Sequence, residues 1–484
     1  DAVDEGRRIS LYFEGVGIHC KVYVNGCYML TNNCGYNSFE VDVTDVVDFG
    51  QENVVAIHID TSEHEGWWYD GGGIYRHVWL YKTDPVHVAP YGVFVKPRKT
   101  ESGWTLEVET ELANDGDTAA AGKVTYTVYD RDGNTVAGGT AAYAVDARDT
   151  VIAKSAFALL DAQLWDPDDP YLYTCETTVH VGDTPVDAVT DRFGCRTFRC
   201  DPDKGLYIND RHVKIRGVCG HYDCGLLGKA VPDNVFRYKV RLMREMGANG
   251  YRTSHYPQAE ALMDALDEAG FIVMDETRWF SSAPAHMAEL AMLVKRDRNH
   301  PCVFFWSVGN EEFVFTTDQG RRIAASMMAL VAKLDPTRPV TAACDRPDKA
   351  TIYDDVDVIG VNYNLQHFDM LHEHFPDKAI FSSENCATGT TRGWYNDDDP
   401  AHGYISAYDA IPRGTGFMAR ELTWKFIAER DWILGGYQWI AFEHRGETVW
   451  PRLCSQSGAI DLFLQKKDAF WQNKSHWTTE PMVH

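Results

Sequence analysis

Eight short apolar segments recur between residues 213 and 443, most of them separated by stretches with helical periodicity. An apolar strand followed by an amphipathic helix is the repeating unit of parallel α/β proteins. Eight such units over roughly 280 residues predict a (β/α)8 TIM barrel. A doubly wound open sheet would instead need a phosphate-binding glycine loop after a strand, which the sequence lacks. The expected strands are 213–221, 250–256, 271–277, 303–311, 339–345, 356–364, 379–387 and 435–443.

The first intervening helix illustrates the pattern. Asp233 can N-cap a helix that places Phe236, Val240 and Met243 on one apolar face, and Gly247 would end it. Spacings of three and four residues put these side chains on the same side of a helix, facing the expected core.

Two all-β regions precede the predicted barrel. Residues 1–86 contain strand-length apolar segments, with Asn25-Gly26 as a hairpin signal. Residues 87–200 contain strands of period two and an Asp132-Gly133 turn, a pattern that favours a small β-sandwich. The predicted domains are therefore 1–86, 87–200 and a barrel over 201–484.

Composition restricts the partners of this chain. A formal net charge of −25 argues against a nucleic-acid partner, because phosphate binding needs a basic surface. The sequence contains no run of eighteen apolar residues, so no membrane span is predicted. The twelve cysteines lack zinc-type spacing, which predicts free thiols and favours a cytoplasmic location. A periplasmic or secreted protein whose leader is missing stays an alternative.

Polar and acidic residues gather where the predicted barrel strands end, the usual place for an active site in such barrels. Two glutamates on different strands suit a retaining glycosidase, one as nucleophile and the other as acid/base. The alternative for each glutamate is a salt-bridged rim residue, although Asn310 beside Glu311 could bind a sugar hydroxyl. Glu312 is interpreted as a charge at a helix N-terminus. The rim residues are Arg252, His255, Asp275, Glu276, Asn310, Glu311, Asn362, Tyr363, Glu384, Trp439 and Glu443.

Two of these rim segments resemble glycoside hydrolase family 2. "WSVGNE" (306–311) is similar to the acid/base segment of that family, and "SENCATGTTRGWY" (383–395) is similar to its nucleophile segment. Near the last strand, β-galactosidase-type members carry "WTGFDYRGE" and "SSQFGILD" where this sequence has "WIAFEHRGE" and "CSQSGAIDL". Further similar segments, in the same order, are "VYVNG", "GGGIYRHVWL", "RGVCGHYDCGLLG", "MREMGANGYRTSHYP", "GFIVMDE" and "DPTRPVTAA".

The resemblance covers nearly the whole chain and implies a partial jelly-roll sugar-binding domain, an immunoglobulin-like sandwich and a catalytic TIM barrel. It implies a retaining exo-β-glycosidase that acts on β-galactosides by double displacement, with a small-molecule or oligosaccharide substrate. Glu311 would be the acid/base and Glu384 the nucleophile. The implied substrate-binding residues are His221, Arg252, His255, Asn310, Tyr363 and Trp439.

These implied roles are chemically reasonable. Tyr363 could donate a hydrogen bond to the nucleophile, and Arg252 could keep Glu384 ionised. Trp439 offers a flat apolar face for the C–H side of a pyranose. For His221 and His255 the alternative is a structural histidine.

The sequence departs from the galactosidase pattern at three places. An Asp that reaches the sugar in some galactosidases is Trp67 here, and a His three residues after the nucleophile is Ala387. The magnesium site of those enzymes needs a Glu-x-His, which the segment 277–290 lacks. No metal and no cofactor are therefore expected.

The sugar specificity has alternatives. Glucuronidases of this family carry an Asn-x-Lys segment whose Lys pairs with the sugar carboxylate, and Ser455-Gln456-Ser457 stands there in this chain. A neutral hexose is therefore expected, unless Lys466 or Arg445 supplies the charge. The alternatives are a β-glucuronidase, a β-mannosidase or a non-catalytic carbohydrate-binding relative. The chain is interpreted as a fragment lacking N-terminal strands and C-terminal domains, and a homo-oligomer is left open.

Overall fold

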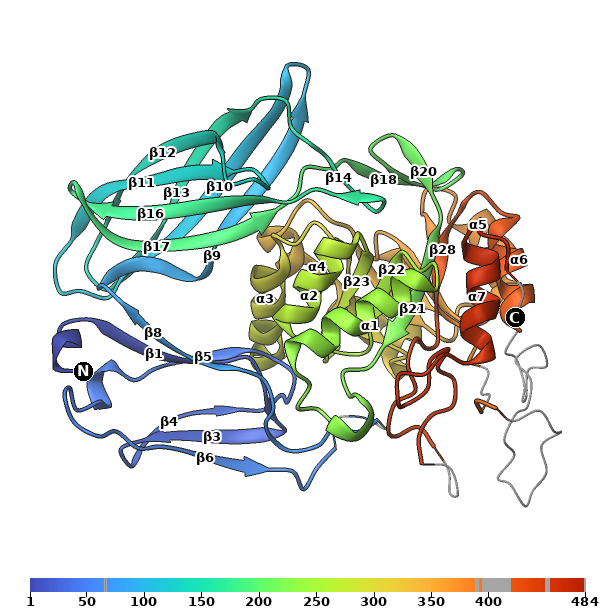
Figure 1. Ribbon diagram of the computed structural model, residues 1–484, viewed down its shortest axis with the longest axis horizontal. Coiled ribbons are helices and arrows are strands. Elements are labelled where there is room, and N and C mark those ends of the chain that lie inside the picture. The colour runs from blue at the N-terminus through green and yellow to red at the C-terminus, as the bar shows by residue number, and fades with distance from the viewer. Residues whose placement is uncertain (65, 67, 388–390, 394–418, 449–452, 483–484) are drawn as a thin grey trace. The chain divides into compact units, whose positions relative to one another are not determined.

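In the computed structural model the chain forms two compact units. The first comprises Asp1–Glu63, Gly72–Thr197 and Lys295–Pro301, and the second comprises His64–Gly71, Phe198–Val294 and Cys302–His484. Figure 1 labels the elements of both units. The structure describes residues 1–64, 66, 68–387, 391–393, 419–448 and 453–482.

The first part of unit one contains small antiparallel sheets. Their shared core contains Ile9, Phe13, Val22 and Val41, and along β3 the buried residues alternate with more exposed ones. The predicted Asn25-Gly26 turn joins β3 to β4, with both residues at positive φ. One sheet has β1 (Arg8–Phe13), β5 (Phe39–Asp42) and β8 (Val78–Thr83); another has β3 (His19–Val24), β4 (Cys27–Asn32) and β6 (Val55–Asp60); β2 (Val16–Gly17) pairs with β7 (Gly73–Ile74).

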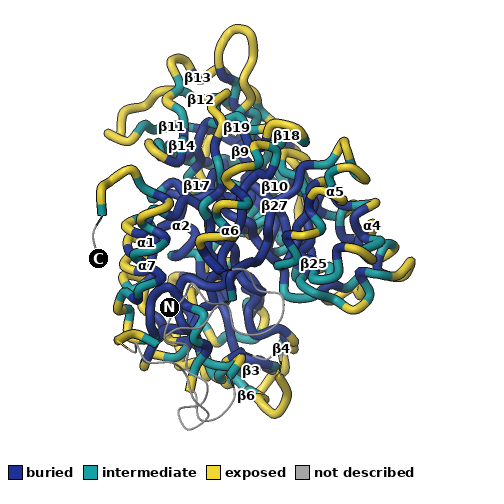
Figure 2. Tube along the Cα trace, turned by 90° about the vertical axis from the view of Figure 1, so that its right-hand side faces the viewer, coloured by how far each residue is buried: buried dark blue, intermediate teal, exposed yellow. Residues whose placement is uncertain are grey.

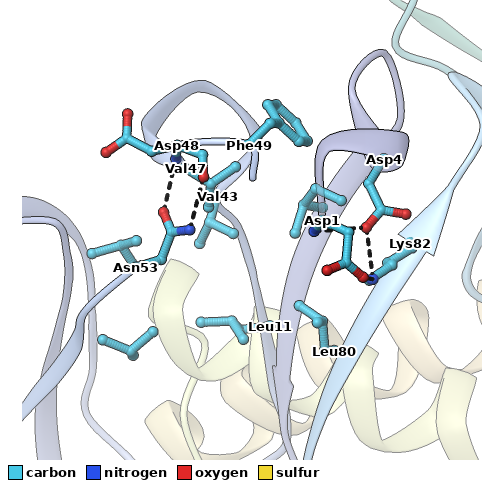
Figure 3. A pocket seen from close by; sticks show the side chains of 13 residues that line it. Asp1, Asp4, Leu11, Val43, Val47, Asp48, Phe49, Asn53, Leu80 and Lys82 are labelled. Atoms are coloured by element: carbon cyan, nitrogen blue, oxygen red, sulfur yellow. Dashed lines mark hydrogen bonds and ion pairs between the residues drawn. The ribbon is translucent and has the colours of Figure 1, made fainter. Parts of the chain in front are cut away.

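A pocket of about 270 Å³ opens among these strands (Figure 3). At one edge Lys82 Nζ pairs with Asp4 at 2.7 Å, and at another the Asn53 side chain bonds the backbone of Asp48. All its lining residues belong to unit one, so it is no part of the barrel. Its apolar lining comes from Ile9, Leu11, Val24, Val43, Val47, Phe49, Val55 and Leu80.

The rest of unit one is a β-sandwich. Its two sheets alternate buried and exposed residues, and Leu106, Val108 and Val124 lie in the core between them. The predicted turn at Asp132-Gly133 joins β11 to β12, with Gly133 at positive φ. One sheet orders β13 (Asp149–Leu159), β10 (Gly103–Asn114) and β9 (Val86–Thr100); the other orders β12 (Thr135–Val145), β11 (Ala120–Tyr129), β16 (Tyr173–Val181) and β17 (Thr184–Phe193).

Unit two is built on a closed barrel of eight parallel strands, which confirms the predicted TIM barrel. β28 pairs with β21 to close it, and a β-carbon at Gly435 would collide with the backbone of Ile215 at that contact. Every residue of β27 is buried (Figure 2). The strands are β21 (Ile215–Gly220), β22 (Gly250–Thr253), β23 (Ile272–Glu276), β24 (Val303–Asn310), β25 (Val340–Cys344), β26 (Ile359–Asn362), β27 (Ile380–Asn385) and β28 (Ile433–Gln438).

Helices follow most of these strands in the chain. Between β25 and β26 the described connection holds only a 3-10 helix, η5 (Thr351–Asp354). Before the barrel, β18 (Phe198–Asp201), β19 (Gly205–Ile208) and β20 (Arg211–Val213) form a small sheet. The α-helices are α1 (Asp233–Glu245), α2 (Glu260–Ala269), α3 (Pro284–Asp297), α4 (Asp318–Leu334), α5 (Phe368–His374), α6 (Arg420–Ala428) and α7 (Asp468–Trp477).

Several predicted boundaries are wrong; the strand expected at 250–256, for example, ends at Thr253. Pro232, not Asp233, precedes α1, because its fixed φ presets the helix entry and Asp233 then adds its charge to the first turn. The expected strand 213–221 divides between β20 and β21. The expected strand 435–443 begins two residues earlier, at Ile433, and ends five residues earlier, at Gln438, where pairing with β21 stops.

The predictions about thiols and membranes can be compared with the described residues. The twelve cysteines, all within the described ranges, form no disulfide with one another, and nine of them are buried. None of the helices within the described ranges combines the length and apolar character that crossing a membrane requires.

Candidate active site

Arg252 at the end of β22 connects the acidic residues at the C-terminal end of the barrel. Its guanidinium donates to Glu276 Oε2 at 2.8 Å, to Glu384 Oε1 at 2.7 Å and to Asn310 Oδ1 at 2.8 Å. The side chain of Arg252 is fully buried, so these bonds replace the water that the charge has lost. Because its partners come from β23, β24 and β27, one cation fixes three strand ends together.

Glu311 joins the same network through two amides. Asn362 Nδ2 donates to Glu311 Oε1 at 2.8 Å and to Asn310 Oδ1 at 3.0 Å. The Asn362 side chain is itself held by Ser383 Oγ, which donates to its Oδ1 at 2.7 Å. A continuous hydrogen-bonded path therefore connects Glu311 to Arg252 and so to Glu384.

The backbone leaves its strand conformation where the key side chains begin. Glu311 has φ +53° and Tyr363 has φ +56°, a left-handed conformation that costs free energy for residues with a side chain. The Tyr363 hydroxyl donates to the Glu384 side chain, as expected. The backbone N–H of Tyr363 donates to the backbone carbonyl of Glu384 at 2.6 Å. These bonds hold the turn at Tyr363 in place, and at the other turn the Glu311 N–H donates to the Ala343 carbonyl at 2.8 Å.

The carboxyl pKa values divide into two groups. Burial raises the pKa of Glu384 to about 8, with Glu311 adding to the rise while Arg252 and Tyr363 oppose it. Burial also raises the pKa of Glu311, against the hydrogen bond from Asn362. Glu276 differs: although burial raises its pKa, Arg252 and His255 lower it to about 2. Glu276 is thus held as an anion, whereas burial favours the protonated form of both Glu311 and Glu384.

Aromatic rings form one wall beside these carboxylates. The His255 ring stacks on Trp439 at 5.2 Å between centroids, and the His221 ring meets Trp439 edge-on at 5.3 Å. His255 Nε2 also lies 3.6 Å from Glu384 Oε1. Trp439 is itself only 4% exposed, with the His255 ring covering one face of its indole. All eight residues predicted for the site thus lie in one connected cluster.

Trp68 belongs to this wall and was not predicted from the sequence. It comes from His64–Gly71, a short segment grouped with the barrel although its neighbours in the chain belong to unit one. Its ring lies 5.4 Å from His221 and 5.6 Å from His255, and Arg278 lies over it. The neighbouring Trp67, expected to replace an Asp, lies outside the described residues.

Glu276 and Asn362 also belong to the site. Both were recognised as strand-end residues, but neither was assigned a function, because their partners come from other strands. Ala387, expected at a position where other members have His, is described and half-buried. In the segment 277–290, which lacks the Glu-x-His of the magnesium site, the ring of His286 stacks on Trp279.

The cations near the expected specificity segment already have anionic partners. Lys466 pairs with Glu245, and Arg445 Nη1 lies 3.9 Å from Asp223. The buried Lys467 donates to Glu443 Oε1 at 2.9 Å and to the Gln456 carbonyl at 2.8 Å. Lys466 and Lys467 are therefore charge-compensated, whereas Arg445 Nη1 lacks a hydrogen-bond partner among the described residues.

Three family descriptions match consecutive parts of the chain. "Glycosyl hydrolases family 2, sugar binding domain" matches residues 2–85. "Glycosyl hydrolases family 2" matches residues 86–196. "Glycosyl hydrolases family 2, TIM barrel domain" matches residues 202–283 and 280–387.

Individual relatives differ in the activity that their names state. A β-galactosidase from Bacteroides ovatus is 32% identical over all of this chain and 64% of its own length. A β-glucuronidase from Bacteroides fragilis is 26% identical over 99% of this chain and 74% of its own length. This chain therefore spans slightly less than two thirds of the first of these relatives.

Solved structures share the fold. A β-glycosidase from Bacteroides vulgatus is 26% identical, with a TM-score of 0.88 over 100% of this chain and 66% of its own. A glycosyl hydrolase family 2 member from Bacteroides cellulosilyticus is 29% identical, with a TM-score of 0.84 over 99% of this chain and 62% of its own.

Proposed function

Because this chain belongs to glycosyl hydrolases family 2, we propose that it is a retaining exo-β-glycosidase whose preferred substrates are β-galactosides. The observation that carries the proposal is the hydrogen-bonded path from Glu384 through Arg252, Asn310 and Asn362 to Glu311. A path of this kind fixes two carboxyl groups from different strands at one place, as double displacement requires.

In the proposed first step, the Glu384 carboxylate attacks the anomeric carbon. The glycosidic C–O bond breaks, and the proton held by Glu311 moves to the leaving oxygen. In the second step water attacks the glycosyl ester, Glu311 takes the proton of that water, and the ester bond to Glu384 breaks. The sugar leaves with its original β configuration.

The remaining residues would bind and position the sugar. Trp439 would pack against the C–H side of the ring, while His221 and His255 would bond hydroxyl groups. Asn310 lies next to the acid/base, where an amide can bond a hydroxyl. Arg252 and Tyr363 both donate to Glu384, so they favour its ionised form when it attacks.

A neutral sugar is proposed because Ser455 stands where glucuronidases carry a cation, and both lysines nearby are paired with carboxylates. Ser455 carries no charge, and Lys466, Arg445 and Lys467 each face a carboxylate. An unpaired sugar carboxylate there would cost about 3–5 kcal/mol, or about 10²- to 10⁴-fold in kcat/KM. The name of the Bacteroides ovatus relative supports a β-galactoside.

The alternative is a β-glucuronidase, which the name of the Bacteroides fragilis relative supports. A β-mannosidase and a non-catalytic carbohydrate-binding relative are weaker candidates. The two glutamates argue against the non-catalytic alternative, because binding a sugar does not need two buried carboxyl groups joined through one hydrogen-bonded path.

Hydrolysis of nitrophenyl glycosides tests the proposal. kcat/KM should be higher for the β-galactoside than for the β-glucuronide, and NMR of the first-formed sugar should show the β anomer. Equal or faster hydrolysis of the glucuronide would show that a cation does pair with the sugar carboxylate. Initial release of the α anomer would rule out double displacement.

A further inference from the structure

Arg278 is a cation without an anionic partner at the C-terminal end of the barrel. It follows the end of β23 by two residues, and its guanidinium lies 4.8 Å from the ring centroid of Trp68 and 4.3 Å from that of Trp279. Its buried Nε has no hydrogen-bond partner, and no carboxylate within the described ranges forms an ion pair with it. Arg252, by contrast, bonds two carboxylates. Because a guanidinium that loses water needs a partner in exchange, Arg278 is placed to pair with an incoming anion.

The loop that carries Arg278 packs against the segment that follows β24. The Phe280 ring of this loop meets the Phe315 ring edge-on, with 4.9 Å between centroids. Phe315 lies in the 3-10 helix η4 (Phe313–Thr316), which begins two residues after Glu311. The loop therefore lies beside the proposed acid/base.

Electrostatics place the guanidinium on the same side. Burial raises the pKa of Glu312, and the positive charge of Arg278 opposes that rise, so the guanidinium acts on the residue next to Glu311. In the proposed reaction Glu311 protonates the leaving oxygen. The aglycone, which carries that oxygen away, must therefore lie on the side where Arg278 is found.

Two further nitrogens of the same loop are buried and unbonded. Trp279 Nε1 and His286 Nδ1 have no hydrogen-bond partner among the residues described. The two rings stack with 5.3 Å between centroids, which holds both nitrogens in one place. Buried nitrogens are nearly always hydrogen-bonded, so three unbonded ones in one loop indicate a place where an acceptor binds.

The chemistry of these groups suits an anion. The N–H groups of arginine and of an indole can only donate, so the ligand must supply the acceptors. A planar guanidinium binds a carboxylate or a sulfate through two parallel N–H···O bonds. A neutral hydroxyl group would leave the charge of Arg278 uncompensated. Because the net charge of the chain is −25, attraction of an anion at this place depends on the local cation and not on the protein surface as a whole.

We propose that Arg278, Trp279 and Trp68 form an aglycone subsite for a negatively charged sugar, one that carries a carboxylate or a sulfate ester. The inference rests on the proposed function, because the aglycone is defined by the bond that Glu311 and Glu384 would cleave. It adds an acidic neighbour on the far side of that bond to a neutral sugar in the glycone site. The two indole rings hold the guanidinium against them, so less side-chain freedom is lost when the anion binds.

Lactose and two analogues of it test the subsite. In the analogues C6 of the glucose residue carries a carboxylate or a sulfate ester, so all three substrates share the glycone and the linkage. We expect kcat/KM for the better acidic analogue to exceed that for lactose by about 10- to 100-fold, the usual effect of hydrogen bonds to a charged group. The two acidic analogues show which anion is preferred. Added NaCl should reduce the preference, because salt screens a pair that is partly exposed.

Variants of Arg278 identify the cation. Arg278→Gln should bring the ratio of kcat/KM for the acidic analogue to that for lactose close to one. Arg278→Lys keeps the charge but not the planar fork, so it should keep part of the preference. The ratio is the readout because a general loss of positioning slows all three substrates alike. Arg322→Gln, at an exposed position of α4, is the matched control and should keep the full preference.

The inference is refuted if the unsubstituted protein prefers neither acidic analogue, or if Arg278→Gln, shown by circular dichroism to be folded, keeps the preference. Either result leaves the proposed function standing as long as nitrophenyl β-galactoside is cleaved. If it is not cleaved, the proposed function fails, and the three substrates are built on the glycone that is cleaved. A selective loss of nitrophenyl β-glucuronide hydrolysis in Arg278→Gln would place the cation at the glycone and overturn the aglycone assignment.

Discussion

The sandwich core and the barrel rim bury side chains of opposite character. Between the sandwich sheets the buried side chains are mainly apolar, such as Leu106 and Val124, and the buried Thr110 hydroxyl bonds that of Tyr126 at 2.9 Å. At the rim the buried groups are ions, including Arg252, Glu276 and Glu384. Apolar burial stabilises a fold, whereas removing ions from water costs free energy that their mutual attraction only partly returns.

The residues that stabilise the fold and those that would carry the chemistry therefore lie in different parts of the chain. An ion network of low net benefit to folding is understandable where it positions reacting groups and shifts their pKa values. Changes at the rim should therefore alter activity more than stability, and changes in the sandwich should do the opposite.

The largest effect on activity is expected at Glu384. Glu384→Gln removes the attacking anion and keeps the size of the side chain, so kcat should fall by about 10⁵- to 10⁶-fold, as when other hydrolases lose a covalent nucleophile. Steady-state kinetics measure the loss, and the matched control is Glu421→Gln at an exposed position of α6. A Glu384→Gln protein that is folded and keeps most of its turnover would contradict the comparison.

A smaller loss is expected at Glu311. Glu311→Ala removes the proton donor, which should slow substrates with poor leaving groups by about 10²- to 10⁴-fold. Substrates with good leaving groups should keep a fast first step, and added azide should restore turnover and give a β-glycosyl azide. Glu312→Ala is the neighbouring control and should need no azide. An α-glycosyl azide would exclude retention.

A moderate effect is expected in the pH profile. The active form has Glu384 ionised and Glu311 protonated, and burial raises the pKa of both. Activity should therefore be lost as the pH falls through the raised lower pKa of the pair, and this acidic limb should lie above 4.5, the ordinary value for Glu. The dependence of kcat/KM on pH measures it. An acidic limb below 4.5 would mean that Arg252 lowers the pKa of Glu384 by more than burial raises it.

The smallest effect on activity is expected in the sandwich. Leu106 is fully buried, so Leu106→Ala should destabilise the sandwich by about 2–5 kcal/mol. Hydrogen exchange should speed up in β10 and β11, while kcat/KM under native conditions stays unchanged. A large fall in kcat/KM without unfolding would show that the two regions are not separate.

Much of the fold was predictable because periodicity is local. The eight apolar strands, the turn at Asn25-Gly26 and the buried face of α1 follow from residues close in the chain. The end of β28 was missed because apolar residues continue through Trp439 after the pairing with β21 has stopped. A strand boundary of this kind depends on the neighbouring strand.

The candidate site divides in the same way. Glu311 and Glu384 could be selected because they follow apolar strands and sit in recognisable segments. Trp68 comes from a loop that is distant in sequence, and Glu276 acquires its low pKa only from Arg252 and His255. Nothing in the local sequence of Trp68 or Glu276 records those partners.

Trapping of the glycosyl-enzyme tests the central claim most directly. A 2-fluoro-β-galactosyl fluoride forms the covalent intermediate but slows its hydrolysis, so the label survives digestion and can be located by mass spectrometry. The account predicts one label per chain, on Glu384, and no label in Glu384→Gln. A label on Glu276, Glu443 or Glu311 would contradict it.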